Sequence, residues 1–542
     1  MLGKMMDFQL TIPVVMRHAA RIHGDTEIVS KLADGSLHRY RYADAFKRAA
    51  KLAGALEKLG VKQGDVIGTL AWNSYRHFEL YYGIPGVGAV CHTINPRLSD
   101  EQFDFVLNDA EDQWVFVDAD FLPLMSRLAD KFKTVKGYVV LCDEEAMPAH
   151  ELPNVYCYET LLAEQSGEFD WPELEENQAC GICYTSGTTG NPKGVVYSHR
   201  STVLISLTAN TSSSVGMLPE DSLLAVVPMF HVNAWNIPYA GAMAGAKMVF
   251  PGRFMGDGQA LAELMNAERV RFASGVPTVW LALLQYLRES NTKLETVERL
   301  MVGGAATPLA LMQAFEEEQG IFMQQGWGMT ETSPLGTMNM PTPSMMAMEK
   351  DEQFALRKTV GRPTFGIEVR IVDDALNEMP WDGKSPGSFQ VRGPWVCSQY
   401  LGIEKADAHT EDGWFDTGDI AVIDSKGYVS ITDRSKDVIK SGGEWISSAD
   451  LENAVMAHDK VLEAAAIGVY HPKWSERPLL IVVSKPGEEV SEQELKDFLE
   501  TQVTRWWIPE SILFTTELPH TATGKISKKD LREQYRDFSY EG

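Results

Sequence analysis

The sequence of 542 residues contains no run of about 18 consecutive apolar residues, so it predicts no helix that crosses a membrane. Its N-terminus, residues 1–10, lacks an apolar core of the length that a signal peptide needs. Cysteine is also scarce. The six thiols show no regular spacing that would indicate a disulfide framework. These absences together predict a cytoplasmic protein with free, buried cysteines.

Basic residues are in deficit. Lys and Arg number 49 against 75 Asp and Glu, which gives a formal net charge of −26. Nucleic acids and anionic membrane surfaces both attract a basic face, so this balance argues against them as partners. A polyanionic small molecule would have to be held locally, by backbone N–H groups and a few placed Lys and Arg side chains.

Two common nucleotide-binding and metal-binding patterns are missing as well. The sequence has no G-x-x-x-x-G-K-[ST] pattern, which a P-loop nucleotidase would carry. Cys180 and Cys183 form a lone C-x-x-C, whereas a zinc site needs further ligands and no second pair exists. Because residues 181–184 have the composition of a buried strand, we interpret these two cysteines as structural.

Hydrophobic periodicity predicts strands that alternate with helices up to about residue 335. Such alternation is typical of parallel sheets covered by helices on both faces. It occurs in two stretches, the second from about residue 180. Helices are expected at 41–60 and 78–89, and strands at 66–70, 112–118, 139–141, 223–227, 247–250 and 300–302.

The pattern changes after about residue 360. Short strands separated by Gly, Asp and Pro turns predict a small β subdomain, and the last hundred or so residues are mixed. We expect an α/β protein with a large domain over residues 1–434, made of two doubly wound α/β subdomains plus the small β subdomain. A smaller, mobile α+β domain is expected over residues 435–542, with the hinge near 434–436. The later strands are expected at 369–372, 387–392, 428–431, 462–469 and 479–483, and the later helices at 451–458 and 491–502.

The strongest local feature is a glycine-rich loop, T-S-G-T-T-G-N-P-K-G, at residues 185–194. Its glycines let the backbone turn sharply and direct N–H groups at an anion, its hydroxyls add donors, and its lysine adds a positive charge. A loop of this composition after a buried strand predicts a phosphate-binding site. The residues that would form it are Thr185, Ser186, Gly187, Thr188, Thr189, Gly190 and Lys193.

This loop resembles the signature loop of the adenylate-forming enzyme superfamily, which includes acyl-CoA synthetases, peptide-synthetase adenylation domains and firefly-type luciferases. Further stretches resemble the motifs of that family in the same order. One departure is Ser475, where the family often has glycine, and serine should be tolerated unless the backbone there needs a positive φ. The matching stretches are 228–235 (P-M-F-H-V-N-A-W), 302–306 (V-G-G-A-A), 325–332 (Q-G-W-G-M-T-E-T), 414–419 (W-F-D-T-G-D), 431–437 (I-T-D-R-S-K-D), 440–445 (K-S-G-G-E-W) and 519–526 (P-H-T-A-T-G-K-I).

The resemblance implies roles in ATP binding. An aromatic ring such as Trp327 can stack on adenine, and a carboxylate such as Asp419 can accept hydrogen bonds from both ribose hydroxyls. Glu331 supplies an oxygen ligand suited to Mg²⁺, with Thr185 as its partner, and Thr330 would reach the α-phosphate. The other expected nucleotide contacts are Gly304, Ala305, Ala306, Gly326, Gly328, Met329, Ile431, Arg434 and Lys525.

The resemblance also implies an acyl site and a CoA side. His231 would lie near the acyl carboxylate, and Lys525 would contact that carboxylate and the α-phosphate in the first step. Lys436 matches the hinge about which the small domain rotates between steps. The acyl pocket is expected to include Trp235, Gly303 and Pro334, and the CoA side Lys440, Gly442, Gly443, Glu444 and Trp445. Most of the nearby basic residues, Lys528, Lys529, Arg532 and Arg536, are expected to form a solvated helix face.

The predicted function is that of an ATP-dependent, AMP-forming acid–CoA ligase, with ATP, Mg²⁺ and coenzyme A, acting on a small carboxylic acid. The sequence is similar to medium-chain fatty acyl-CoA synthetases and to methylmercaptopropionate–CoA ligases, so a short- or medium-chain fatty acid or 3-(methylthio)propionate is expected. A homodimer is implied by the resemblance alone. The alternatives are a luciferase-like or aryl-acid adenylating enzyme and, less favoured, a P-loop nucleotidase or a nucleotide-binding module without catalysis. The residues expected to act in catalysis are Lys525, His231, Thr330, Glu331 and Lys440.

Overall fold

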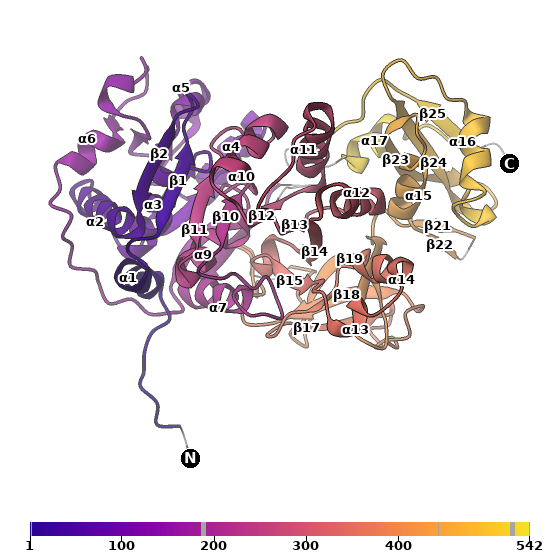
Figure 1. Cartoon of the computed structure of the whole chain (residues 1–542), viewed down its shortest axis with the longest axis horizontal. Coiled ribbons are helices and arrows are strands. Elements are labelled where there is room, and N and C mark those ends of the chain that lie inside the picture. The colour runs from indigo at the N-terminus through magenta and orange to yellow at the C-terminus, as the bar shows by residue number, and fades with distance from the viewer. Residues whose placement is uncertain (2, 186–190, 405, 443, 521–525, 541–542) are drawn as a thin grey trace.

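The computed structural model describes residues 1, 3–185, 191–404, 406–442, 444–520 and 526–540. Within these ranges the strands form sheets of seven, nine, four and five strands. Figure 1 shows a large body that holds the first three sheets and a separate small lobe, drawn in yellow, that holds the fourth. This arrangement confirms the predicted fold class, a large N-terminal domain of parallel α/β sheets and a smaller C-terminal domain.

The seven-stranded sheet is parallel except for its last pair, β8 and β9, which run antiparallel. Four consecutive residues are buried in each of its inner strands β4 and β5, as expected for a sheet covered on both faces. In spatial order its strands are β7 (Val155–Cys157), β6 (Gly137–Val140), β5 (Trp114–Val117), β3 (Val66–Leu70), β4 (Val90–Thr93), β8 (Ala179–Tyr184) and β9 (Gly194–Ser198).

The nine-stranded sheet has a parallel centre, from β14 to β1, and antiparallel strands at both edges. Ligands of such sheets bind beyond the carboxyl ends of the parallel strands, so the segments after β10, β13 and β14 are expected to border a ligand site. In spatial order the strands are β16 (Arg362–Pro363), β15 (Leu335–Met338), β14 (Phe322–Gly328), β13 (Arg299–Val302), β12 (Phe272–Gly275), β10 (Ser222–Ala225), β11 (Lys247–Phe250), β1 (Glu27–Lys31) and β2 (Leu37–Arg41).

The chain then forms two smaller sheets. The antiparallel four-stranded sheet is the predicted β subdomain, and its last strand ends where the five-stranded sheet of the small lobe is about to begin. The four strands are β17 (Glu368–Val372), β18 (Gly387–Arg392), β19 (Phe415–Ile423) and β20 (Val429–Arg434). The five are β21 (Ile439–Ser441), β22 (Glu444–Ile446), β23 (Val461–His471), β24 (Ser475–Ser484) and β25 (Ser511–Phe514).

Several helices begin at a serine whose side-chain oxygen accepts a backbone N–H of the first turn, which satisfies a donor that would otherwise lack a partner. Ser74 caps α3 in this way, Ser99 caps α4, and Ser491 caps α16 as its sequence pattern predicts. The α-helices are α1 (Ile12–Ile22), α2 (Tyr42–Lys58), α3 (Tyr75–Gly86), α4 (Asp100–Asp109), α5 (Leu122–Leu128), α6 (Tyr158–Ala163), α7 (His199–Ala209), α8 (Val232–Trp235), α9 (Ile237–Ala244), α10 (Gly258–Ala267), α11 (Pro277–Ser290), α12 (Leu309–Ala314), α13 (Pro343–Met346), α14 (Lys350–Arg357), α15 (Ser448–Met456), α16 (Glu492–Leu499) and α17 (Lys528–Gln534).

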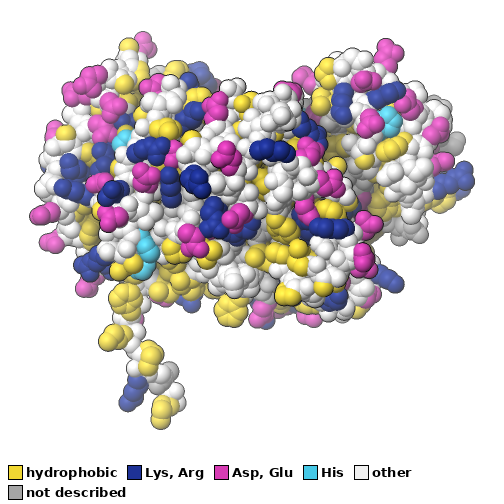
Figure 2. Space-filling view, in the orientation of Figure 1, with side chains coloured by type: hydrophobic (Ala, Val, Ile, Leu, Met, Phe, Trp, Pro, Cys, Tyr) yellow, Lys and Arg dark blue, Asp and Glu magenta, His cyan; other side chains and the backbone are white. Residues whose placement is uncertain are grey.

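The surface carries charged side chains of both signs (Figure 2). Acidic and basic side chains are interspersed over the face drawn in Figure 2. Among the described residues, none of the helices has both the length and the apolar character needed to cross a membrane.

Ser475 adopts φ = +68°, the left-handed region that favours glycine. The departure from the family pattern at this position therefore places a strained residue at the start of β24.

The six cysteines are free in the structure, as predicted. Cys180 and Cys183 cannot act together because residues three apart in a strand point to opposite faces. Burial raises the pKa of Cys142, Cys180 and Cys397 to about 12, which leaves little reactive thiolate at neutral pH.

We therefore expect the native protein to react slowly with a thiol reagent at pH 8. Unfolding in guanidinium, without any reductant, should expose all six thiols to rapid reaction. A colorimetric thiol titration measures both states. Fewer than six reactive thiols in the unfolded protein would reveal a disulfide and contradict this account.

Candidate active site

A cavity of about 490 Å³ lies where the glycine-rich loop, the nine-stranded sheet, the four-stranded sheet and the small lobe meet. Motifs that are far apart in the sequence thus border one space, at the carboxyl ends of β13 and β14 as the fold class predicts. The predicted site residues that line it are Thr185, Lys193, His231, Trp235, Gly303, Gly304, Gly326, Trp327, Gly328, Met329, Thr330, Glu331, Pro334, Arg434 and Lys436.

Other predicted residues lie elsewhere. Ala305 and Ala306 are exposed and do not line the cavity, and Ile431 is half-buried within β20. On the predicted CoA side, Lys440 is exposed, with its ammonium 5.9 Å from the centre of the Trp445 ring, and neither they nor Gly442 line the cavity. Glu444 is the first residue of β22. The predicted residues Ser186, Gly187, Thr188, Thr189, Gly190, Gly443 and Lys525 lie outside the described ranges.

A larger hollow, of about 740 Å³, lies over β17 and β18 and is more open to solvent. Its lining includes Phe365, Trp381 and Trp414, and it contains none of the predicted site residues. Size alone therefore does not identify the site, and we assign the chemistry to the smaller cavity because the motifs converge there.

Trp327, Asp419 and Arg434 form one linked set. The indole N–H of Trp327 donates to Asp419 Oδ2 at 2.9 Å, and Arg434 Nε lies 2.9 Å from Asp419 Oδ1. The neighbouring Gly328 has no room for a side chain, because an added Cβ would lie 1.6 Å from the carbonyl oxygen of Pro334. Trp327 and Arg434 line the cavity, and Asp419, which is not in the lining, holds both of them from behind. A flat aromatic ring and a guanidinium suit a nucleoside with its phosphate.

Glu331 is 6 % exposed and is held by a residue that the sequence analysis did not single out. Tyr400 donates its phenol O–H to Glu331 Oε1 at 2.7 Å, and the ammonium of Lys193 lies 4.9 Å from the centre of the Tyr400 ring. Burial raises the pKa of the Glu331 carboxyl, and the hydrogen bond from Tyr400 acts in the opposite direction. Tyr400 therefore links the predicted metal ligand to the predicted phosphate-binding lysine.

The two residues of the predicted acyl site, His231 and Trp235, line the cavity and flank a turn between β10 and α9. The Trp235 ring packs against Gly303, where an added Cβ would lie 3.2 Å from the ring and 3.2 Å from the carbonyl oxygen of Gly326. A residue larger than glycine at 303 would push against the indole. Gly303 and Trp235 thus define the width of this end together.

The small lobe contributes cations to the cavity, which corrects the expectation of a solvated helix face. Ile526, Ser527, Lys528, Lys529 and Arg532 line it. Lys528 pairs with Glu452 at 2.7 Å, and Arg532 pairs with Asp437 at 2.6 Å.

The surroundings of Lys436 show that this part of the cavity is electropositive. Burial lowers the pKa of its ammonium, and the nearby Arg434, Arg532 and Lys193 lower it further, whereas Asp437 raises it. An acidic protein can therefore hold a polyanion here, because cations from both domains face the same space.

The oxygen-bearing side chains in the cavity suit Mg²⁺, which needs few protein ligands, better than a metal ion whose ligands all come from the protein. Over the described part of the chain, no three His, Cys, Asp or Glu side chains gather closely enough to hold an ion. The carboxylate of Glu331 and the hydroxyl-bearing Thr185 both line the cavity. Mg²⁺ commonly takes one or two protein oxygens and completes its shell with water and phosphate oxygens.

Comparison with known proteins identifies the family. The family model described as AMP-binding enzyme matches residues 16–401, and the model of the AMP-binding enzyme C-terminal domain matches residues 450–525. The fold and the two family models together define the class of protein, an AMP-binding enzyme with a large and a small domain. The chain belongs to the AMP-binding enzyme family.

Two relatives and one solved structure show the closeness of the match. The chain is 47% identical over 537 residues to the 3-methylmercaptopropionyl-CoA ligase of Ruegeria lacuscaerulensis, covering 99% of both chains. It is 45% identical over 537 residues to the medium-chain-fatty-acid–CoA ligase of Ectopseudomonas oleovorans, covering 99% of this chain and 98% of the relative. The crystal structure of ATP-bound MatB from Rhodopseudomonas palustris matches with a TM-score of 0.82 at 26% identity, over 97% of this chain and 99% of that one.

Proposed function

We propose that the protein joins a short- or medium-chain carboxylic acid to coenzyme A in two steps, through an acyl-adenylate and with release of pyrophosphate. The observation that carries the proposal is one cavity lined by Thr185 and Lys193 of the glycine-rich loop, by the buried carboxylate of Glu331, and by His231 and Trp235. The relatives named above are CoA ligases, which favours this function over a luciferase or an aryl-acid adenylating enzyme.

In the first step the residues around the cavity bring two anions together. A carboxylate and a triphosphate repel each other, so the site must hold both and disperse the charge that develops on the α-phosphate. Lys193, Thr185 and Thr330 would hold the phosphates, Lys525 would bridge the acid and the α-phosphate, and His231 would orient the acid. When bound, Mg²⁺ at Glu331 and Thr185 would neutralise phosphate charge.

The second step requires a different face of the small domain. Of the predicted CoA-side residues, Lys440, Gly442 and Trp445 do not line the cavity in this structure, whereas Ile526 and Ser527 do. The large domain would cover residues 1–434 and the small one residues 435–542. A rotation about Lys436 would move Ile526 and Ser527 out of the cavity and bring the CoA-side residues to it. The chain leaves the four-stranded sheet at Arg434 and enters the five-stranded sheet at Ile439, which supports a hinge in this interval.

Acid-dependent exchange of labelled pyrophosphate into ATP tests the proposed order of steps. It should proceed with ATP, Mg²⁺ and the acid in the absence of CoA, because the acyl-adenylate forms before CoA is needed. Exchange that requires CoA would rule out a free acyl-adenylate step.

The relatives' names indicate two kinds of acid, a medium-chain fatty acid and 3-(methylthio)propionate. Trp235 should limit the length of the acid, because its indole packs on Gly303 at the acyl end. We expect Trp235→Ala to raise the ratio of kcat/KM for decanoate to that for butyrate by about tenfold or more, since each methylene in an apolar pocket contributes a factor of that order.

Trp381→Ala is the matched control, because Trp381 lies in the larger hollow and is 44% exposed. Its ratio should equal that of the wild type. An unchanged ratio in Trp235→Ala as well would mean that the indole does not limit the pocket.

A cytoplasmic location and a homodimer complete the proposal. The free state of the six cysteines supports a reducing compartment. The homodimer rests on resemblance, and light scattering of the purified protein measures it directly.

A further inference from the structure

The turn that carries the acyl end of the cavity has an unusual backbone. Five consecutive residues, 232–236, have positive φ values between 44° and 61°. L-amino acids rarely adopt this left-handed conformation, and a run of them includes Val232 and Trp235, a β-branched and a bulky residue for which it is least favourable. Strain of this kind persists only where the surroundings determine it.

The left-handed turn has a consequence for the site. His231 is extended and directly precedes the left-handed run, and Trp235 is the fourth residue of that run. Both side chains line the cavity. The conformation of the turn therefore places the acid-orienting histidine and the pocket-limiting tryptophan together.

The segment that enters this turn is held from the other sheet. At Met229, two residues before His231, the backbone N–H donates to Asn73 Oδ1 at 2.6 Å, and the carbonyl oxygen accepts a short hydrogen bond from the phenol of Tyr81. The Tyr81 oxygen also lies 3.4 Å from the side-chain oxygen of Asn233, inside the turn. Both Tyr81 and Asn73 are fully buried. The two peptide groups that flank the Cα atom of Met229 are thus each held by a buried side chain.

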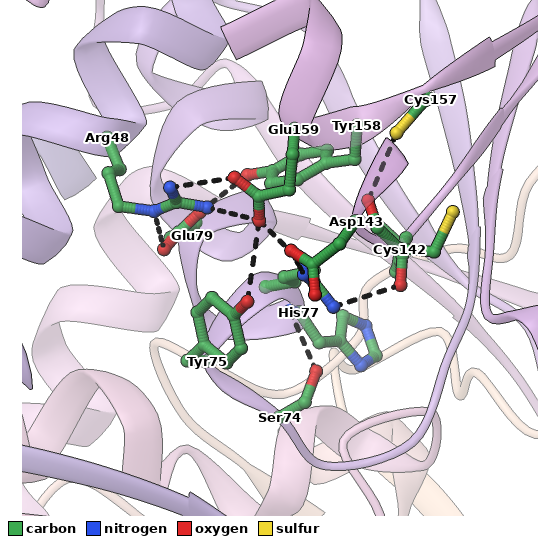
Figure 3. A network of polar contacts seen from close by, with 12 residues as sticks. Arg48, Ser74, Tyr75, His77, Glu79, Cys142, Asp143, Cys157, Tyr158 and Glu159 are labelled. Atoms are coloured by element: carbon green, nitrogen blue, oxygen red, sulfur yellow. Dashed lines mark hydrogen bonds and ion pairs between the residues drawn. The ribbon is translucent and has the colours of Figure 1, made fainter. Parts of the chain in front are cut away.

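Tyr81 is itself a fixed point because α3 is anchored. Figure 3 shows Glu79, on the same helix, beside Arg48 and Tyr158. Arg48 pairs with Glu79 at 2.7 Å, and Tyr158 donates to the other Glu79 oxygen at 2.7 Å. Arg48 also pairs with Glu159 at 2.8 Å, which ties α2, α3 and α6 together. The phenol of Tyr81 is therefore presented from a rigid support.

We propose that Tyr81 is a positioning residue of the acyl site. It does not line the cavity, and it fixes His231 and Trp235 through Met229 and the left-handed turn. The acid specificity is then determined partly by a side chain on the first sheet's helix α3. This inference rests on the proposed function, since it concerns the acid that the cavity takes.

The chain offers a matched control next to Tyr81. Tyr82 is also fully buried in α3, and its phenol donates to a backbone carbonyl, that of Pro238, at 2.9 Å. Pro238 lies in α9, beyond the turn. Tyr82→Phe thus removes the same kind of bond from the same helix without touching the entry to the turn.

We expect Tyr81→Phe to raise the KM for the acid about tenfold, with the KM for ATP unchanged, and to flatten the preference among acids of different length. Tyr82→Phe should keep wild-type values for both substrates. The midpoint of thermal unfolding should fall to a similar extent in the two variants. A difference between their KM values for the acid would then not result from a difference in stability. Equal acid KM values in both variants would overturn the proposal.

A crystal structure of Tyr81→Phe gives a second test that needs no activity. Residues 231–236 should be displaced relative to a wild-type crystal structure, and the Trp235 ring should no longer pack on Gly303. An unmoved turn would overturn the inference even if the enzyme is an acid–CoA ligase. Absence of acyl-adenylate formation in the wild type, with a displaced turn in the variant, would instead refute the proposed function alone.

Discussion

Replacing Lys525 by alanine should slow acyl-adenylate formation by about 10²–10³-fold, while the conversion of supplied acyl-AMP and CoA to the thioester stays within a few-fold of the wild type. A cation that bridges two anions stabilises only the step in which those anions react. The described residues that follow Lys525, Ile526 and Ser527, line the cavity, which is where this step would occur. The two half-reactions are measured separately, by pyrophosphate exchange and by thioester formation.

Arg536→Ala serves as the control, because Arg536 is an exposed cation beyond the end of α17. It should leave both half-reactions unchanged. If Lys525→Ala slowed both half-reactions equally, the assignment of this lysine to the first step would be wrong.

Glu331→Gln should have a comparable effect, a loss of about 10²-fold or more in the first step. Glutamine has nearly the same shape and still accepts the hydrogen bond from Tyr400, so the variant removes a charge and little else. Without the carboxylate the site should need much more Mg²⁺. Initial rates of pyrophosphate release against Mg²⁺ concentration measure this directly.

Tyr400→Phe separates the role of the carboxylate from that of its support. It removes the phenol O–H from Glu331 but keeps the ring that faces Lys193. The Mg²⁺ concentration that gives the half-maximal rate should rise several-fold. This rise should be much smaller than the rise in Glu331→Gln. A variant of Glu331 with wild-type Mg²⁺ dependence would remove this residue from the proposed metal site.

The fold class could be predicted because strands and helices alternate with clear periodicity. The expected strands at 66–70, 247–250 and 387–392 coincide with β3, β11 and β18. Serines such as Ser491 marked helix starts, since their oxygen accepts a first-turn N–H. These features depend on local sequence, which is why one sequence was sufficient for them.

The residues that support the site could not be predicted in the same way. The phenols of Tyr400 and Tyr81 donate to groups distant in sequence, and no local pattern marks such a partner. The left-handed turn at 232–236 contains Val and Trp, which local preferences place elsewhere. Lys528 and Arg532 were expected to face solvent, because helical spacing does not show that another domain packs against that helix.

The most direct test of the account is a measurement of pyrophosphate release and acyl-CoA formation by the intact protein with ATP, Mg²⁺ and CoA. The acids should include acetate to decanoate, 3-(methylthio)propionate and aromatic acids. Pyrophosphate and thioester should form in equal amounts, with the highest kcat/KM at a fatty acid of intermediate length or at the thioether acid. Pyrophosphate release without thioester, or a preference for aromatic acids, would contradict it.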